Sequence, residues 1–351
     1  MNLADVITDQ HNSEKPLKPF IIAEAGVNHE ADMNLAIRLV EEAKEGGADA
    51  IKFQSYKAET IASKNSPSYW DLEKEPTTSQ FKLFKKYDSF WKKEFEELRT
   101  VCDRNNIEFL STPFDIESSN FLDDLMGTFK ISSSDLNNKP FIEHICDFGK
   151  PILLSTGASY INEVDNTVSW IKNHGNPLAL MHCILNYPCN DENANLGMIL
   201  DLRARYPDLV IGYSDHTLPK DMKTVETAVI LGSKIIEKHF TFDKTLPGND
   251  HYHAMDKYDL LRLGQRLDDL EQIIGTTKKK PIDTEMISRK NARRSLVLSC
   301  ELKKDEVISK DCLTWKRPGT GISPDEIDDV IGKRVNKDLN EDDIIHWEDL
   351  Y

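Results

Sequence analysis

Two lysines lie inside short apolar runs, where a buried positive charge is costly unless it meets a fixed anion. Lys52 lies in AIKFQ and Lys130 in TFKIS, and the hydroxyl groups of Thr112, Ser133 and Ser214 lie in or directly after other runs. This combination favours a pocket for a phosphate or a carboxylate. Two alternatives stay open. The lysine stems could cover apolar surface while their ammonium groups reach solvent, or one lysine could form a Schiff base with a carbonyl substrate.

A pair of histidines ends two later runs. His216 follows VIGYSD and His239 ends KIIEKH, with Asp215 and Glu237 beside them in the sequence. Neutral imidazoles at neighbouring strand ends can hold a divalent metal ion and leave coordination positions open for substrate. Because no cysteine adjoins the pair, we expect a borderline or hard ion, with Mn2+ favoured over Mg2+ and Co2+. The alternative is that each histidine is a hydrogen-bonded core residue.

These residues share a place at the ends of eight short apolar runs that alternate with amphipathic stretches. The runs begin at Phe20, Ala50, Phe109, Thr128, Pro151, Leu178, Val210 and Lys234. Alternating strands and helices are typical of a parallel sheet, and eight pairs in this length predict an α/β fold, the (β/α)8 TIM barrel. An open doubly wound sheet is the alternative, but no G-x-G-x-x-G follows the first run. Reactive groups of such barrels gather at the carboxyl ends of the strands.

The chain is expected to contain a second, smaller domain. The barrel domain is assigned to residues 1–280, with 1–19 as an N-terminal extension, 281–292 as a linker, and 293–351 as a small β-rich domain. A core of this size is marginal, so the small domain should dock on the barrel or on a second chain. A long segment without clear period, from Ser55 to about Ser89, is predicted to be a functional loop.

Composition excludes several classes of protein. The 351 residues carry 44 Lys and Arg against 60 Asp and Glu, a formal charge of -16 that argues against binding nucleic acid or an anionic membrane. No apolar run reaches the roughly 18 residues of a membrane-spanning helix, and the amino terminus is polar, so we expect a cytoplasmic protein. Six scattered cysteines without a C-x-x-C pair are expected to be reduced thiols.

A series of motifs resembles one family, the sialic acid (nonulosonic acid) synthases. The motifs are IIAEAGVNH, GGADAIKFQ, FLSTPFD, KISSSD, KPILLSTGAS, HCILNYP, IGYSDHT, IEKHFT, LPGNDH, NARRSL and KRPGTGIS. They run in the family's order from Phe20 to the end, where the small domain is similar to type III antifreeze protein (a SAF domain). The resemblance implies a transferase that condenses phosphoenolpyruvate with an N-acetylmannosamine-type sugar, giving a nine-carbon 2-keto acid and phosphate.

The resemblance also implies roles for single residues. The positions that match the phosphoenolpyruvate site are Lys52, Thr112, Lys130, Ser133 and Ser214, and Glu237 is placed with the substrate-binding residues. His216 and His239 match the metal ligands, while Gln54 and Tyr187 match positions that contact the sugar. Acidic site positions are matched by Glu24, Asp135 and Asp250. Arg317 matches an arginine that reaches the sugar site of the other subunit in a domain-swapped homodimer.

The chain departs from the family pattern in two places. The family often has N-H-N-G after the first strand, where this chain has Asn28-His29-Glu30-Ala31. Leu185 stands where a polar residue is common, so the polar role is expected to shift to Asn186. These departures leave open a sugar-binding protein without turnover, as well as a Schiff-base pyruvate lyase. The sugar is also open, since precursors of legionaminic or pseudaminic acid and a 6-phosphorylated sugar remain alternatives.

Overall fold

The computed structural model of the chain describes residues 2–8, 18–248 and 250–351. The chain divides into two compact units, Met1–Thr277 and Lys278–Tyr351. This division lies close to residue 280, where the sequence predicts the barrel to end. Within the residues described, no helix combines the length and the apolar character that a membrane span requires.

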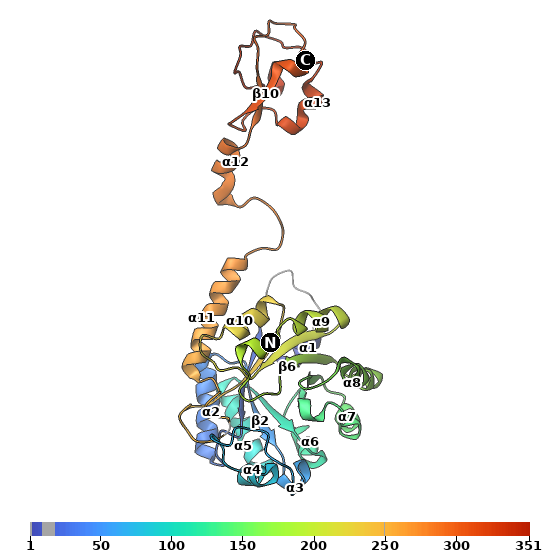
Figure 1. The fold of residues 1–351 in the computed structure, drawn as a ribbon, viewed down its shortest axis with the longest axis vertical. Coiled ribbons are helices and arrows are strands. Elements are labelled where there is room, and N and C mark those ends of the chain that lie inside the picture. Colours follow the sequence, from blue (N-terminus) through green and yellow to red (C-terminus); the bar gives the residue numbers. More distant parts are fainter. Residues whose placement is uncertain (1, 9–17, 249) are drawn as a thin grey trace. The chain divides into compact units, whose positions relative to one another are not determined.

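The first unit is built on eight parallel strands (Figure 1). They are β1 (Phe20–Gly26), β2 (Ala50–Ser55), β3 (Glu108–Pro113), β4 (Phe129–Ile131), β5 (Ile152–Ser155), β6 (Leu178–Cys183), β7 (Val210–Asp215) and β8 (Ile235–His239). Consecutive strands pair from β1 to β3 and from β4 to β8, β1 also pairs with β8, and β3 lies beside β4. The predicted barrel of eight strands is therefore confirmed.

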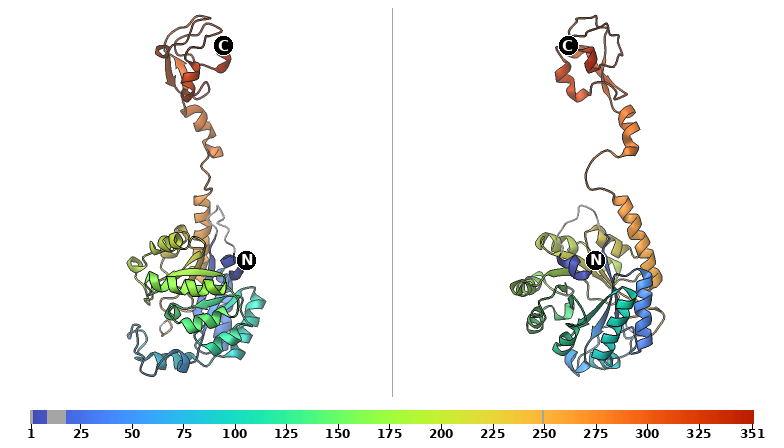
Figure 2. Two further views of the ribbon diagram at one scale, coloured as in Figure 1. Left: turned by 90° about the vertical axis from the view of Figure 1, so that its right-hand side faces the viewer. Right: turned by 180° about the vertical axis from the view of Figure 1, so that it is seen from behind.

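A helix follows each strand and lies on the outside of the sheet (Figures 1 and 2). These helices are α2 (Met33–Gly46), α5 (Lys92–Asn105), α6 (Ile116–Leu122), α7 (Lys139–Cys146), α8 (Ile161–His174), α9 (Met198–Arg205), α10 (Lys223–Ile230) and α11 (Lys257–Ile274). In α2 the Asp32 side chain accepts hydrogen bonds from the first backbone amides, and Gly47 ends the helix at a φ of 91°.

Side-chain alternation along the strands fills the barrel interior. In β1, Ile21 and Ala23 belong to a large apolar cluster that also includes residues of the helices. Phe20 and Ile22 belong to a second cluster, which includes residues of β2, β3, β5, β6 and β8. Because alternate side chains point to opposite faces, the residue two places beyond each inward apolar residue also points inward. By this rule the side chain of Glu24, two places beyond Ile22, points into the barrel interior.

A short helix closes the interior cluster. Helix α1 (Leu3–Thr8) buries Leu3 and Ile7 against the inward side chains of the strands. The backbone amide of Leu3 donates a hydrogen bond of 2.8 Å to the Glu108 carboxylate at the start of β3. Part of the segment treated as an N-terminal extension therefore belongs to the barrel core.

The long segment between β2 and α5 contains more regular structure than the sequence predicts. It includes α3 (Ala58–Ile61) and α4 (Gln80–Tyr87). The prediction of a segment without helical period is wrong for α4, because Ser79 caps its first turn and Leu83 is buried beneath it. Trp70 is also buried, and its indole N–H donates to the carbonyl oxygen of Glu75 at 3.0 Å.

The second unit contains little regular structure. Its antiparallel sheet consists of β9 (Ser295–Leu298) and β10 (Leu313–Lys316), and its α-helices are α12 (Met286–Ala292) and α13 (Ile327–Val330). Helix α12 occupies most of the segment that the sequence treats as a linker. Leu296, Leu298, Ile308, Val330 and Ile345 form the centre of a separate apolar core.

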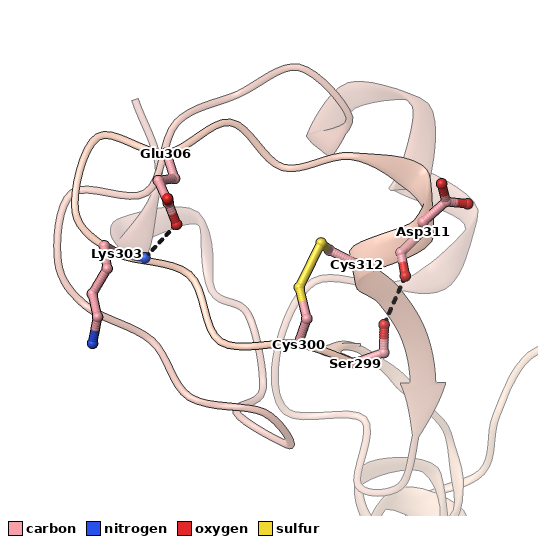
Figure 3. Close-up of a disulfide and its surroundings, with 6 residues drawn as sticks. All are labelled: Ser299, Cys300, Lys303, Glu306, Asp311 and Cys312. Carbon is pink, nitrogen blue, oxygen red and sulfur yellow. Dashed lines mark hydrogen bonds between the residues drawn. A yellow bond between two sulfur atoms is a disulfide. The ribbon is translucent and has the colours of Figure 1, made fainter.

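A disulfide links Cys300 and Cys312 in this unit (Figure 3). The prediction that all six cysteines are reduced is wrong for this pair, which joins the segment after β9 to the start of β10. The pairing of β9 with β10 brings the two Cα atoms to 5.4 Å, although 12 positions separate them in the sequence. The other four, Cys102, Cys146, Cys183 and Cys189, are free and buried, as expected.

Candidate active site

Two pockets adjoin at the carboxyl ends of the strands. The first, which we call the lysine pocket, measures roughly 400 Å³ and is lined by Glu24, Lys52, Gln54, Thr112, Phe114, Lys130, Ser132, Ser133, Ser155, Cys183, Leu185, Tyr187, Ser214, His216, Glu237 and His239. Six of its lining residues lie two positions beyond residues of the interior apolar cluster, as Lys52 lies beyond Ala50 and Glu237 beyond Ile235. Along such a strand, the inward-facing positions therefore change from apolar core residues to polar site residues.

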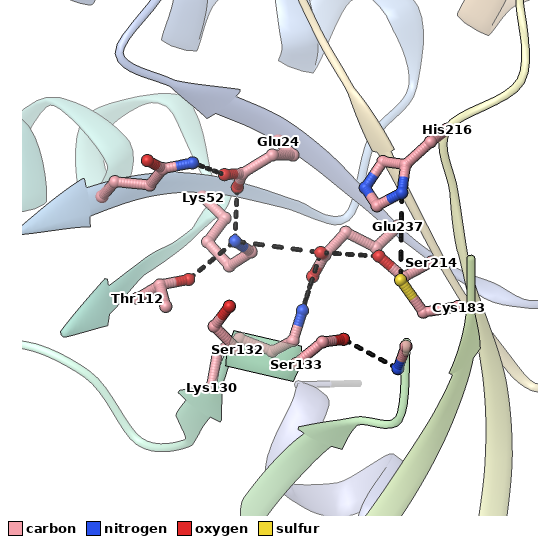
Figure 4. A network of polar contacts seen from close by, with 12 residues as sticks. Glu24, Lys52, Thr112, Lys130, Ser132, Ser133, Cys183, Ser214, His216 and Glu237 are labelled. Atoms are coloured by element: carbon pink, nitrogen blue, oxygen red, sulfur yellow. Dashed lines mark hydrogen bonds and ion pairs between the residues drawn. The ribbon is translucent and has the colours of Figure 1, made fainter. Parts of the chain in front are cut away.

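Lys52 lies among three polar side chains, two on the neighbouring strands β1 and β3 and one on β8 (Figure 4). Its Nζ is 2.5 Å from Glu24 Oε2, donates to Thr112 Oγ1 at 2.8 Å and lies 3.9 Å from Glu237 Oε1. Lys52 is only 2% exposed, so these contacts replace the water that its charge would otherwise require.

Lys130 lies on β4, across the barrel from Glu237 on β8 (Figure 4). Its Nζ donates to Glu237 Oε1 at 2.7 Å and Oε2 at 2.9 Å, and Ser214 Oγ donates to the same Oε1 at 3.1 Å. Glu237 thus lies between both lysines. The two ammonium groups and the two carboxylates of Glu24 and Glu237 form one buried cluster.

The cluster moves the pKa values of its carboxylates in opposite directions. Burial raises the pKa of Glu24 to about 7, an effect that Lys52 opposes and Glu237 reinforces. Burial also acts on Glu237, but Lys130 and Lys52 outweigh it and lower its pKa to about 2. Burial lowers the pKa of Lys130, whereas for Lys52 the nearby Glu237 and Glu24 outweigh burial and raise the pKa.

A close backbone approach shapes one wall of the lysine pocket. The amide of Gly157 donates to Ser133 Oγ at 2.9 Å. A Cβ at this position would lie 2.9 Å from Ser133 Oγ and 3.0 Å from Cys183 Sγ, closer than side-chain atoms normally come. Only glycine therefore lets the loop after β5 hold the Ser133 hydroxyl in place.

The predicted histidine pair meets at the boundary of the two pockets. The ring centroids of His216 and His239 are 5.4 Å apart. His216 Nδ1 lies 2.8 Å from the carbonyl oxygen of Ile184, which can only accept, so Nδ1 carries the proton and Nε2 keeps its lone pair. Burial lowers the pKa of His216 to about 4 and that of His239 well below its usual range. Both rings are therefore neutral at pH 7.

These properties fit a divalent metal ion bound through the two imidazoles. Within the part of the chain that the structure describes, the Nδ1 atom of buried His239 has no hydrogen-bond partner, and it lies 3.8 Å from Asp250 Oδ2. Among the described residues, however, no three His, Cys, Asp or Glu side chains converge as a metal site. An ion held here would keep several coordination positions for substrate and water. Asp215 does not join the pair, because it accepts from buried Lys238 at 2.8 Å.

The second pocket is larger, at roughly 690 Å³, and six of the fifteen residues in its wall are Phe, Tyr or Trp. We call it the aromatic pocket; its lining is Val27, Asn28, Glu30, Gln54, Tyr56, Tyr69, Trp70, Leu83, Phe84, Tyr87, Tyr187, His239, Gly248, Asp250 and His251. Gln54, Tyr187 and His239 line both pockets. The segment between β2 and α5 supplies the aromatic wall from Tyr56 to Tyr87.

Asp250 connects the aromatic pocket to the histidines. Its Oδ1 lies 3.5 Å from His253 Nε2, and His253 is fully buried. Burial would raise the pKa of Asp250, but His239 and His253 outweigh it and hold the pKa well below its usual range. Asp250 is therefore a carboxylate at neutral pH.

The structure brings most predicted site residues into one of the two pockets, with three exceptions. Asp135 lies outside both linings, where its carboxylate accepts from Asn138 at 3.1 Å, and burial raises its pKa. Asn186 is exposed and also lies outside both linings, while Leu185 lines the lysine pocket. Arg317 is an exposed residue of the second unit.

Some lining residues were given no role from the sequence, although Ser155 was noted as a polar residue at the end of the fifth strand. Ser155 and Cys183 follow inward core residues at a spacing of two, and this period alone would have identified them. The aromatic residues of the 55–89 segment carried no such pattern, because they come from α4 and from loops. Glu30 was noted only as a departure from the family motif.

Comparison with known proteins identifies both units. The sequence model of the NeuB family matches residues 39–279, and that of the SAF domain matches residues 293–350. The chain is 39% identical over 339 residues to the N,N'-diacetyllegionaminic acid synthase of Legionella pneumophila, covering 94% of each chain. It is 29% identical to the human N-acetylneuraminate-9-phosphate synthase, covering 93% of this chain and 91% of that one.

A solved structure shares this architecture. The N-acetylneuraminic acid (sialic acid) synthetase of Leptospira borgpetersenii, crystallised with citrate, is 36% identical and superposes with a TM-score of 0.70. The alignment covers 78% of this chain and 90% of that one.

Proposed function

Since this chain belongs to the NeuB family, whose model matches residues 39–279, we propose that it condenses phosphoenolpyruvate with an N-acetylated mannose-type sugar. The products would be a nine-carbon 2-keto acid and inorganic phosphate. The observation that carries this proposal is the pair of adjoining pockets, one with two buried lysines and the other rich in aromatic residues. A small anion in the first pocket and a larger uncharged molecule in the second can then meet at the residues that line both pockets.

The lysine pocket supplies the parts that phosphoenolpyruvate requires. Lys52 and Lys130 provide charge for its phosphate and carboxylate, and Thr112, Ser133 and Ser214 provide hydroxyl donors. Glu24 and Glu237 neutralise the lysines when the pocket is empty. The substrate anion replaces part of this internal pairing as it binds.

The proposed reaction forms a carbon–carbon bond and a carbon–oxygen bond from water, and it breaks the carbon–oxygen bond to phosphate. C3 of the enolpyruvate attacks the aldehyde carbon of the open-chain sugar, and the aldehyde oxygen takes up a proton and becomes a hydroxyl. Water adds at C2 with loss of a proton, and the tetrahedral intermediate expels phosphate by C2–O cleavage. Glu24, with a pKa of about 7, is suited to take the proton of the attacking water. Asp250 lies at the sugar side, where it can accept a hydrogen bond from the substrate.

We propose that His216 and His239 hold a divalent ion, with Mn2+ as the first choice. When bound there, such an ion would act as a Lewis acid on the sugar carbonyl. The protein's own part is to keep both imidazoles neutral and to orient His216 through the Ile184 carbonyl.

A diacetamido-trideoxy sugar is a second candidate for the acceptor. The Legionella pneumophila relative is named for a diacetylated product. In this chain, Tyr69, Trp70 and Phe84 line the aromatic pocket and offer apolar surface to a second acetyl group or a deoxy carbon. N-acetylmannosamine and the diacetamido sugar should therefore be compared directly.

Arg317 is the residue through which the proposed dimer would complete its active sites. We propose that the second unit of one subunit places this exposed arginine over the aromatic pocket of the other, as the family resemblance implies. The SAF-domain match over residues 293–350 supports the resemblance on which this role rests.

The test is a phosphate-release assay in which one component is omitted at a time. We expect phosphate only when phosphoenolpyruvate, a suitable sugar and a divalent ion are all present, and we expect EDTA to abolish it. Full turnover after EDTA treatment would contradict the metal role. Sugar binding without phosphate release would favour the non-catalytic alternative. An adduct trapped by borohydride with pyruvate would favour the Schiff-base lyase.

A further inference from the structure

The aromatic pocket contains a carboxylate in a constrained position. Glu30 Oε1 accepts from His251 Nε2 at 2.9 Å, and His251 Nδ1 lies 2.7 Å from Thr241 Oγ1. Burial, followed by the charge of Glu30, raises the pKa of Tyr87 above its usual range, so Tyr87 is a neutral phenol at pH 7. The hydrogen bond from His251, on the loop after β8, positions the Glu30 carboxylate.

The backbone at Glu30 adopts a conformation that is unfavourable for its residue type. Glu30 has a φ of 50° and Ala31 a φ of 59°, both in the left-handed region. This region suits glycine or asparagine and costs other residues free energy. Strain of this kind is found where a side chain is needed at a functional site.

The two pockets differ in charge. The lysine pocket is lined by two lysines and two glutamates, whose charges balance. Of the described residues that line the aromatic pocket, Glu30 and Asp250 are the charged ones besides histidines, and none is Lys or Arg. The Glu30 side chain is 36% exposed, and an anionic group placed beside it would meet a like charge, which is unfavourable.

We propose that Glu30 is a specificity-determining residue that restricts the acceptor to an uncharged N-acetylated sugar and rejects a phosphorylated one. This inference rests on the proposed function and assigns the acceptor's charge class. The carboxylate accepts a hydrogen bond from a sugar hydroxyl, which a neutral acceptor offers. A phosphate monoester would bring roughly two negative charges to the same position.

The experiment measures kcat and KM for three acceptors with the full-length protein. The acceptors are N-acetylmannosamine, 2,4-diacetamido-2,4,6-trideoxymannose and N-acetylmannosamine 6-phosphate, each with phosphoenolpyruvate and Mn2+. We expect the wild-type kcat/KM for the phosphosugar to lie at least about 100-fold below that of the better neutral sugar. In Glu30→Gln, this ratio should shrink by about tenfold or more, through a lower KM for the phosphosugar.

Two further variants separate specificity from folding. Glu30→Gly relieves the positive φ and also removes the charge, so it should fold and show the same loss of discrimination. Glu41→Gln changes an exposed carboxylate on α2 and should leave the ratio unchanged. A purely structural Glu30 would instead lower activity toward all acceptors equally.

The outcomes also separate this inference from the proposed function. Equal use of the phosphosugar and a neutral sugar by the wild type, or an unchanged ratio in both Glu30 variants, would overturn the inference while the synthase function stands. Failure to release phosphate with any of the three acceptors would overturn the proposed function, and the inference with it.

Discussion

Glu24 and Glu237 are both buried carboxylates in one pocket, yet the pKa of Glu24 rises to about 7 and that of Glu237 falls to about 2. The difference follows from their neighbours, because Glu237 contacts Lys130 and also faces Lys52, whereas Glu24 has Lys52 alone. The lysines could be identified from the sequence because they interrupt apolar strands. Which carboxylate each would meet could not, since the pairing depends on which residues face each other across the closed barrel.

The raised pKa of Glu24 predicts an acid limb in the pH profile. A carboxyl with a pKa of about 7 is protonated below that pH and cannot act as a base, so kcat/KM should fall as the pH drops through 7. Glu24→Gln should lower kcat by roughly 100- to 10,000-fold, and its residual activity should lack this limb. Phosphate release between pH 5.5 and 9 measures both effects. If the acid limb persisted in Glu24→Gln, the titration of another group would be its cause.

The Lys130–Glu237 pair predicts an asymmetric effect on stability. Lys130→Met leaves buried Glu237 with Lys52 at 3.9 Å and should cost about 3–5 kcal/mol of unfolding free energy. Adding Glu237→Leu removes the unpaired charge, so the double variant should recover most of that loss while remaining inactive. Urea denaturation and phosphate release test the pair. A double variant less stable than Lys130→Met would contradict the expectation.

At the scale of elements, the strands could be predicted from the sequence, and a functional loop was predicted between β2 and α5. The helices within that segment and the side chains that line the pocket could not be predicted. Continuous apolar runs marked each strand from β1 to β8, because these strands are buried on both faces. The segment from Ser55 to Ser89 gave no period, although α4 lies within it and its aromatic residues line the second pocket. Short helices in a loop pack through a few side chains only, too few for a periodic signal.

Two glycines predict opposite responses to the same substitution. A Cβ on Gly212 in β7 would overlap Met181 Sδ and lie 2.6 Å from the Ile235 carbonyl oxygen, so Gly212→Ala should destabilise the barrel by about 1–3 kcal/mol. Gly264 in α11 has nothing within 4 Å of the added atom, so Gly264→Ala should stabilise by up to about 1 kcal/mol. Thermal unfolding measures both. Equal shifts would show that space around β7 does not decide the outcome.

At the scale of the whole chain, the two units depend on different sources of stability. The barrel unit has large apolar clusters, whereas the second unit has one small core and the Cys300–Cys312 disulfide. The sequence indicated that a domain of this size needs support, but the spacing of the two cysteines gave no sign of pairing. Their proximity follows from the antiparallel register of β9 and β10, which only the folded chain provides.

The proposed exchange of Arg317 between subunits predicts complementation. Glu24→Gln and Arg317→Ala should each be weakly active alone. After mixing and subunit exchange, half of the dimers pair one of each, and one of their two sites is complete, so about a quarter of wild-type activity should return. A mixture no more active than its components, with exchange verified by mass spectrometry, would place Arg317 in its own subunit's site or in none.

The buried cluster of two lysines and two glutamates has a consequence for binding thermodynamics. Its charges cancel in the free protein, so an incoming phosphoenolpyruvate anion leaves a surplus of negative charge. That surplus should raise the pKa of Glu24 further, and at pH 8 the complex should take up a proton from the buffer. Calorimetric heats should then differ between Tris and HEPES in the wild type but not in Glu24→Gln. A divalent ion supplied beforehand should suppress the uptake, because metal and proton would serve as interchangeable counter-charges for the same substrate.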